Sequence, residues 1–181
     1  MAFIRVKKIK GKSYAYVVEN RWRKRVKGGK KGARQKVRGY LGRVYYFNRT
    51  RNIDFTNYLR IKDINGYLKK IGFSKAIIEL VRLELLNHGF NEEEDNTYSK
   101  DGIIVRLDKD KFSIKGSGKG KSVIAMNEGF LCKETFNRLV NFRSRGNERE
   151  VGIKLANALV EAGLKVQDDV FVGLFGLLFE E

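Results

Sequence analysis

Hydrophobic and polar residues alternate along the first part of the chain, which is typical of β-strands. The alternating positions in residues 3–18 are Ile4, Val6, Tyr14, Tyr16 and Val18. A second strand-like run covers residues 36–47, and Gly11 marks a turn or bulge inside the first run. The pattern predicts a β-ribbon of two strands that flank the loop at residues 19–35.

Apolar residues at helical spacing predict helices in the rest of the chain. The predicted helices cover residues 63–71, 74–88, 133–142 and 148–162. In the second, Ser74 is expected to cap the start, and Gly89 stands where a left-handed residue ends a helix. Short strands are predicted at residues 103–107, 111–115 and 122–126. The expected fold class is α+β: an N-terminal basic β-ribbon, then a compact α+β body with a short antiparallel sheet and about four helices.

Charge changes this picture because the whole excess of positive over negative residues lies in the first 51 residues. The chain of 181 residues has a formal net charge of +17. Residues 1–51 hold 18 Lys and Arg and one acid, Glu19, whereas residues 52–181 hold 20 residues of each sign. We therefore expect two parts, a basic ribbon with a mobile loop at residues 1–51 and a charge-balanced α+β domain at residues 52–181.

The cations between residues 21 and 38 point to a polyanionic partner. They are Arg21, Arg23, Lys24, Arg25, Lys27, Lys30, Lys31, Arg34, Lys36 and Arg38, and Trp22 lies among them. Lys and Arg neutralise phosphates, and an exposed indole stacks on a base. Two alternatives remain open: the cations only keep the protein in solution, and Trp22 belongs to the core. Likewise, Tyr14, Tyr16 and Tyr40 either form an exposed aromatic surface or pack beneath the sheet.

The segment Lys115–Ser122, KGSGKGKS, is only superficially similar to a phosphate-binding loop. Residue 115 is Lys where that motif requires Gly, and the residues that follow are strand-like rather than helical. We interpret the segment as a hairpin loop. Its Lys119 and Lys121 are predicted to form a second patch that contacts the nucleic-acid backbone.

Residues suited to catalysis or metal binding are scarce. One Cys and one His are too few for a structural zinc site or a disulfide. Cys132 lies in an apolar stretch and is expected in the core, and His88 is expected to cap a helix. A metal-dependent nuclease that uses Asp108, Asp110 or the acids at residues 92–95 remains an alternative. We expect no catalytic residue, metal or cofactor.

The pattern FIRVKKIKGKSYAYVVEN, followed by a basic stretch and RQKVRGYLGRV, resembles the N-terminal segment of many insertion-sequence transposases. The turn of that segment corresponds to Tyr40, Leu41 and Gly42. This resemblance covers about a quarter of the chain and implies that the ribbon contacts DNA. Transposition itself is not implied, because no recognisable carboxylate-bearing nuclease domain follows the ribbon.

The sequence as a whole favours a non-enzymatic nucleic-acid-binding protein, with RNA preferred to DNA, in a ribonucleoprotein or on the ribosome. A DNA-binding protein of transposase-like descent is the main alternative. The apolar segment at residues 170–179 either packs on the body or binds a protein partner. No apolar run reaches the length of a membrane span, and no membrane partner is expected. The cysteine usage and the absence of a signal peptide favour the cytoplasm.

Overall fold

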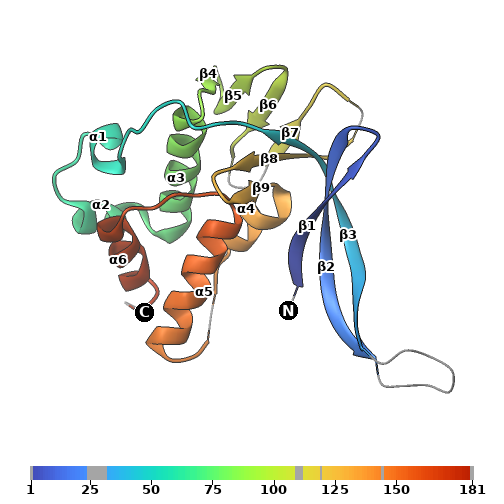
Figure 1. Ribbon diagram of the computed structural model, residues 1–181. Helices are drawn as coiled ribbons and strands as arrows, with labels where there is room; N and C mark the ends of the chain where they lie inside the picture. Colours follow the sequence, from blue (N-terminus) through green and yellow to red (C-terminus); the bar gives the residue numbers. More distant parts are fainter. Residues whose placement is uncertain (1, 24–31, 109–111, 119, 144, 180–181) are drawn as a thin grey trace, which may run out of the picture.

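The computed structural model describes residues 2–23, 32–108, 112–118, 120–143 and 145–179. These residues form an α+β fold with two sheets and six helices (Figure 1). The strands are β1 (Ala2–Ile9), β2 (Lys12–Arg23), β3 (Gly32–Tyr46), β4 (Asn91–Glu92), β5 (Thr97–Lys100), β6 (Ile103–Arg106), β7 (Ser113–Lys115), β8 (Ser122–Met126) and β9 (Gly129–Leu131). The helices are α1 (Phe55–Leu59), α2 (Ile64–Ile71), α3 (Phe73–Asn87), α4 (Lys133–Val140), α5 (Glu148–Glu161) and α6 (Asp168–Gly176).

The ribbon, meaning strands β1–β3, has three strands rather than the predicted two. The residues Lys10 and Gly11 both have positive φ, 47° and 75°, and form a two-residue turn between β1 and β2. Such a turn joins tightly paired antiparallel strands. The turn expected at Gly11 is therefore confirmed, and it divides the first predicted strand into a hairpin. The loop predicted at residues 19–35 is wrong in part, because residues 19–23 continue β2 and residues 32–35 begin β3. Its remaining residues, 24–31, lie outside the described residues.

The long strand β3 continues from the ribbon into the body (Figure 1). Its outer part pairs antiparallel with β2, and residues Arg43–Tyr46 pair in parallel with Ser122–Ala125 of β8. The resulting sheet is mixed and has the order β1-β2-β3-β8-β9. The strand predicted at 122–126 is thus part of the ribbon's sheet. Every residue of β8 is buried, which is typical of a strand covered on both faces.

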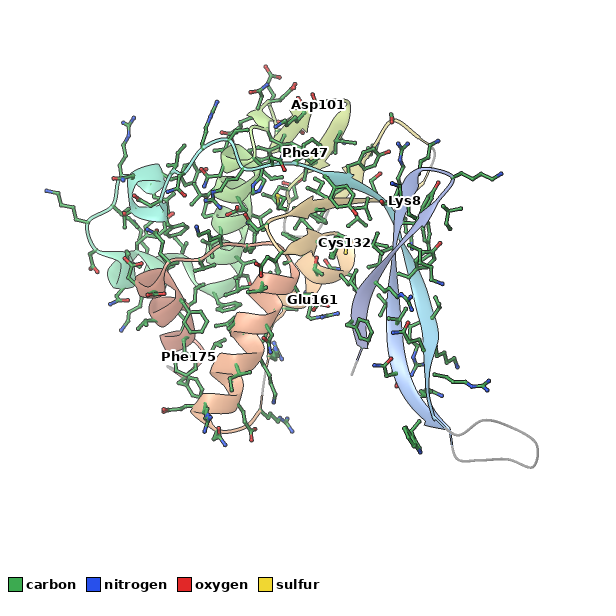
Figure 2. The ribbon with its side chains drawn as sticks, in the orientation of Figure 1. Lys8, Phe47, Asp101, Cys132, Glu161 and Phe175 are labelled. Atoms are coloured by element: carbon green, nitrogen blue, oxygen red, sulfur yellow. The ribbon has the colours of Figure 1, made fainter. Side chains whose placement is uncertain are left out.

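The short antiparallel sheet expected in the body is present as β4-β5-β6-β7. It packs with the helices around one large hydrophobic cluster, in which Ile77, Val81 and Leu85 of α3 are completely buried. A smaller cluster attaches the ribbon to the body. Its buried members are Ala15, Val44, Val123, Ala125 and Cys132, and Ile4, Val6, Leu41 and Phe130 pack against them. Figure 2 shows Cys132 on the side of the body nearer the ribbon, and its predicted place in the core is confirmed.

Helices α1 and α3 differ from the predictions, and α6 contains the apolar segment that was expected to pack on the body or to bind a partner. Helix α3 begins at Phe73, after Gly72, and Ser74 does not cap it, because its hydroxyl donates to the Val140 carbonyl 2.8 Å away. Helix α1, of five residues, was not predicted because it is too short to show a period. The apolar segment 170–179 lies largely in α6, and its Val170 and Leu174 are buried.

A buried polar network fixes the chain where it leaves β3. Arg49 and Asn127 both donate to one carboxylate oxygen of Glu84, at 2.7 and 2.8 Å. The Nδ1 atom of His88, which ends α3 as predicted, lies 2.8 Å from the Glu84 carbonyl. Burial lowers the pKa of His88 below its usual value, against the opposing effects of the Glu84 carbonyl and carboxylate.

Candidate nucleic-acid interface

The two faces of the ribbon differ in chemistry because successive residues of a strand point to opposite sides. On β2, one face presents Tyr14, Tyr16, Val18, Asn20 and Trp22, and we call it the tyrosine face. The opposite face presents Ala15, Val17, Glu19 and Arg21. The smaller hydrophobic cluster includes Ala15, so the opposite face is the one attached to the body.

Exposed cations cover the ribbon, and within its described residues a single acid, Glu19, pairs with them. Arg38 contacts Glu19 at 2.5 Å and Arg21 contacts it at 3.4 Å. Although desolvation opposes the shift, the bonds from Arg38 and the charge of Arg21 lower the pKa of Glu19. No ion pair among the described residues joins a cation of β1–β3 to an acid of the body.

Strand register places like charges side by side at the outer end of the ribbon. Arg21 lies directly opposite Arg34, and both side chains are exposed. Like charges opposite each other on antiparallel strands destabilise the pair. The ribbon therefore maintains a positive surface at a cost to its own stability.

The three tyrosines gather on the tyrosine face. The Tyr40 ring lies between its neighbours, 5.4 Å from the Tyr16 ring and 6.3 Å from the Tyr14 ring, centroid to centroid. Tyr40 is 43% exposed, whereas Tyr14 and Tyr16 are half-buried. Burial, reinforced by the two neighbouring phenols, raises the pKa of Tyr40. The group Tyr14, Tyr16 and Tyr40 is called the tyrosine cluster below.

Trp22 lies on the tyrosine face at the outer end of β2 and is 65% exposed. The alternative that Trp22 belongs to the core is therefore wrong. An indole this accessible presents a flat apolar surface on which a base would stack.

The predicted binding residues fall into three groups. Arg21, Arg34 and Lys36 lie on the face of β2 and β3 opposite the tyrosine face, where Arg38 also reaches Glu19, whereas Trp22 lies on the tyrosine face. Arg23 is described by its backbone alone. Lys121 lies where β8 meets β3, and its carbonyl accepts a hydrogen bond from the Arg43 N–H at 2.9 Å. The others, Lys24, Arg25, Lys27, Lys30, Lys31 and Lys119, lie outside the described residues.

Sequence reasoning missed the cations of the first hairpin. Arg5 and Lys7 of β1 lie on the tyrosine face, since register pairs them with Tyr16 and Tyr14. Arg43 also lies opposite Tyr14, from the other side. The alternation of Arg5 and Lys7 with Ile4 and Val6 would have revealed the basic face of the hairpin, because it predicts a strand with one apolar and one basic face.

A cavity of about 510 Å³ lies where the ribbon meets the body. Tyr40 and Leu41 line it from β3, and Lys121 and Lys133 line it from the body. The predicted patch at Lys121 thus adjoins the ribbon, so basic residues follow one another from the outer end of the ribbon to the body.

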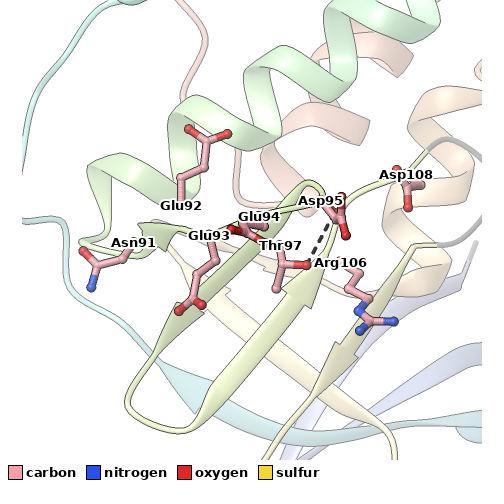
Figure 3. Close-up of a pocket in the computed structure, with 8 residues that line it drawn as sticks. All are labelled: Asn91, Glu92, Glu93, Glu94, Asp95, Thr97, Arg106 and Asp108. Carbon is pink, nitrogen blue, oxygen red and sulfur yellow. Dashed lines mark hydrogen bonds between the residues drawn. The ribbon is translucent and has the colours of Figure 1, made fainter.

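The acidic residues considered for a nuclease lie elsewhere, around a cavity at β4–β6 (Figure 3). Glu92 and Glu93 point in different directions there, and Glu92 accepts the Tyr98 hydroxyl at 2.8 Å. Burial, and then the bond to Glu92, raises the pKa of Tyr98. Within the described ranges no three such side chains are placed to hold a metal ion. Asp110 lies outside those ranges.

No protein-family model matches the chain, and no curated protein or solved structure matches it either. The described part of the chain contains no helix that is long and apolar enough to cross a membrane.

Proposed function

We propose that this protein binds nucleic acid through the ribbon, prefers RNA to DNA, and does not act as an enzyme. The observation that supports this most directly is the near absence of acids from a surface covered with cations. Among the described residues of the ribbon, Glu19 is the one acid that pairs with cations, and its partners are Arg21 and Arg38. The remaining cations of the ribbon are therefore available to phosphates. Neutralising a phosphate releases condensed counterions, which makes binding favourable at physiological salt.

The arrangement of the cations supports a binding role over a role in solubility alone. A protein that needs only net charge for solubility benefits equally from dispersed charges. Here Arg21 and Arg34 are directly opposite each other, which costs stability in the free protein. A polyanion lying across both side chains would convert that repulsion into attraction.

The preference for RNA rests on exposed aromatic residues beside the cations. Proteins that recognise RNA commonly stack unpaired bases on aromatic side chains. Trp22 and Tyr40 offer such rings on the tyrosine face. DNA is the second candidate, because a two-stranded β-ribbon fits the major groove of B-DNA. Between the paired residues Asn20–Gln35 and Arg23–Gly32, the ribbon consists of β2 and β3 alone.

The proposal is tested by replacing residues 20–35 with an Asn-Gly turn, which leaves the paired residues Glu19 and Lys36 on either side of the turn and keeps the register of β2 and β3. We expect the intact protein to bind structured RNA with a steep salt dependence, at a slope of about −0.7 to −0.9 per neutralised phosphate. The shortened protein should bind less tightly and with a shallower slope. Unchanged binding of both RNA and DNA, in a shortened protein that still folds by circular dichroism, would contradict the proposal.

Competition between duplex DNA and structured RNA at the same salt concentration separates the two nucleic acids. Stronger binding of the duplex DNA would favour the transposase-like alternative. Labelled RNA and DNA incubated with Mg²⁺ or Mn²⁺ should remain intact. Cleavage that disappears on adding a chelator would instead indicate a nuclease.

A further inference from the structure

Tyrosine rings interrupt the cationic surface of the tyrosine face near its middle. None of Tyr14, Tyr16 and Tyr40 belongs to either hydrophobic cluster found among the described residues. The three rings contact one another instead, at tilts of 43° for Tyr14–Tyr40 and 52° for Tyr16–Tyr40. The half-buried pair, both from β2, thus packs against the exposed Tyr40 ring of β3.

Positive charges flank these rings. The ammonium group of Lys7 lies 5.6 Å from the centroid of the Tyr16 ring. Arg5 lies across from Tyr16 on the neighbouring strand, where it donates to the side chain of Gln35. On the other side of β2, Arg43 lies opposite Tyr14. An aromatic surface with cations on both sides matches a nucleotide, which has a flat base and a charged phosphate.

We propose that the tyrosine cluster binds an unpaired base of single-stranded nucleic acid, stacked on Tyr40, while Lys7 and Arg43 contact the flanking phosphates. This inference rests on the proposed function and specifies its ligand class. Base pairs in a duplex present only their edges in the grooves, so a single strand or an unpaired loop is required.

Trp22 extends the same surface. It lies six residues from Tyr16 along one face of β2, which corresponds to about 20 Å at the rise of a strand. One strand of several nucleotides would contact both aromatic sites. The tyrosine face is therefore long enough for several nucleotides, with cations beside the tyrosine cluster and a second exposed ring at its outer end.

The experiment compares Tyr40→Leu with two matched controls in the full-length protein. Tyr40→Phe retains the ring, and Tyr46→Leu removes a tyrosine that is 62% exposed on the same strand but on the opposite face. The probes are an oligouridylate of about 12 nucleotides and an abasic oligomer of the same length, which has the phosphates without the bases. Fluorescence anisotropy gives the affinity of each variant for each probe.

We expect Tyr40→Leu to weaken binding of the oligouridylate by about 5- to 150-fold. Binding of the abasic oligomer and the salt dependence of both probes should not change. Tyr40→Phe and Tyr46→Leu should bind within about twofold of the unaltered protein, because neither removes a ring on which a base stacks.

Four results would overturn this inference. Equal affinity of the unaltered protein for the two probes would show that bases make no contribution, although the proposed function would stand. Loss of abasic binding in Tyr40→Leu, or equal losses in Tyr40→Leu and Tyr46→Leu, would show that the substitution acts through the fold. Failure of the unaltered protein to bind either probe, or structured RNA, would refute the proposed function itself.

Discussion

Replacing Arg34 by Gln should make the protein more stable and a weaker nucleic-acid binder. Arg34 faces Arg21 across the ribbon, and no ion pair to Arg34 occurs among the described residues. Relief of a like-charge pair on opposite strands is worth about 0.2–1 kcal/mol. For a domain of this size, 1 kcal/mol corresponds to about 2–4 °C in Tm, so we expect a rise of up to about 4 °C.

Binding should change in the opposite direction. If Arg34 neutralises one phosphate, its loss makes the slope of log K against log salt shallower by about 0.7 for a single strand. Because this electrostatic contribution vanishes near 1 M salt, the loss at 0.15 M salt is about fourfold. Thermal unfolding followed by circular dichroism gives the first quantity, and anisotropy titrations from 50 to 400 mM salt give the second.

The variant Arg34→Lys retains the charge and serves as the control for both measurements. It should show the original Tm and the original slope. An unchanged slope in Arg34→Gln would show that Arg34 contacts no phosphate. A fall in Tm of several degrees would show that Arg34 stabilises the ribbon, which contradicts the account of the opposed arginines.

Three further predictions concern the indole, the junction of β3 with β8, and the buried histidine. Trp22→Ala should cost about 1–3 kcal/mol of single-strand binding and leave Tm unchanged, since the indole is exposed; equal affinities would return Trp22 to a structural role. Gly42 has φ of 145°, and a Cβ there would lie 2.4 Å from the Lys121 carbonyl oxygen, so Gly42→Ala should lose about 2 kcal/mol or more in urea unfolding. Gly39→Ala, where a Cβ meets nothing within 4 Å, is the control, and similar losses would contradict the close approach. The pKa of His88 is lower in the folded protein than in the unfolded chain, so the unfolded chain takes up a proton at a higher pH than the folded protein, from about pH 6.5 downward. The free energy of unfolding should therefore decrease toward pH 5.5, by at most about 1.4 kcal/mol per pH unit. Urea midpoints at pH 7.5 and 5.5 test this, and an equal decrease in His88→Gln would assign it to other groups.

Local patterns were sufficient to predict much of the fold. The helices at residues 63–71 and 148–162 appear nearly as expected, because apolar spacing and capping residues act within a few turns of the chain. Asp63, for example, accepts the backbone N–H of Gly66 at 3.0 Å and fixes the start of α2. The α+β class and the short antiparallel sheet follow from the same kind of information.

Partners distant in sequence were not predictable. Nothing in residues 122–126 indicates that they pair with β3 rather than with the neighbouring body strands, since that choice depends on packing around Val44 and Val123. The network of Glu84 with Arg49 and Asn127 likewise joins three distant segments. Because the sequence does not show which of these residues are close in the folded protein, they look like ordinary surface polar groups.

The candidate interface was only partly predictable for a similar reason. The density of cations after residue 20 is visible in the sequence, whereas the association of Tyr14, Tyr16 and Tyr40 requires the register of two strand pairs. The bulges that bring Tyr40 opposite Tyr16 shift the pairing by one residue at two places in β3. A pattern of alternating residues does not reveal such shifts.

Strand β3 belongs to the ribbon at one end and to the body at the other. Unfolding of the body would therefore remove β8 from its pairing with β3. It would also expose Ala15 and Val44, which are buried in the smaller hydrophobic cluster. A ligand that binds the folded ribbon alone is thus linked to the melting of the whole molecule, by RT ln(1 + [L]/Kd) in free energy. The Tm should therefore rise with nucleic-acid concentration, even when unfolding is followed by a spectroscopic probe on the helices of the body.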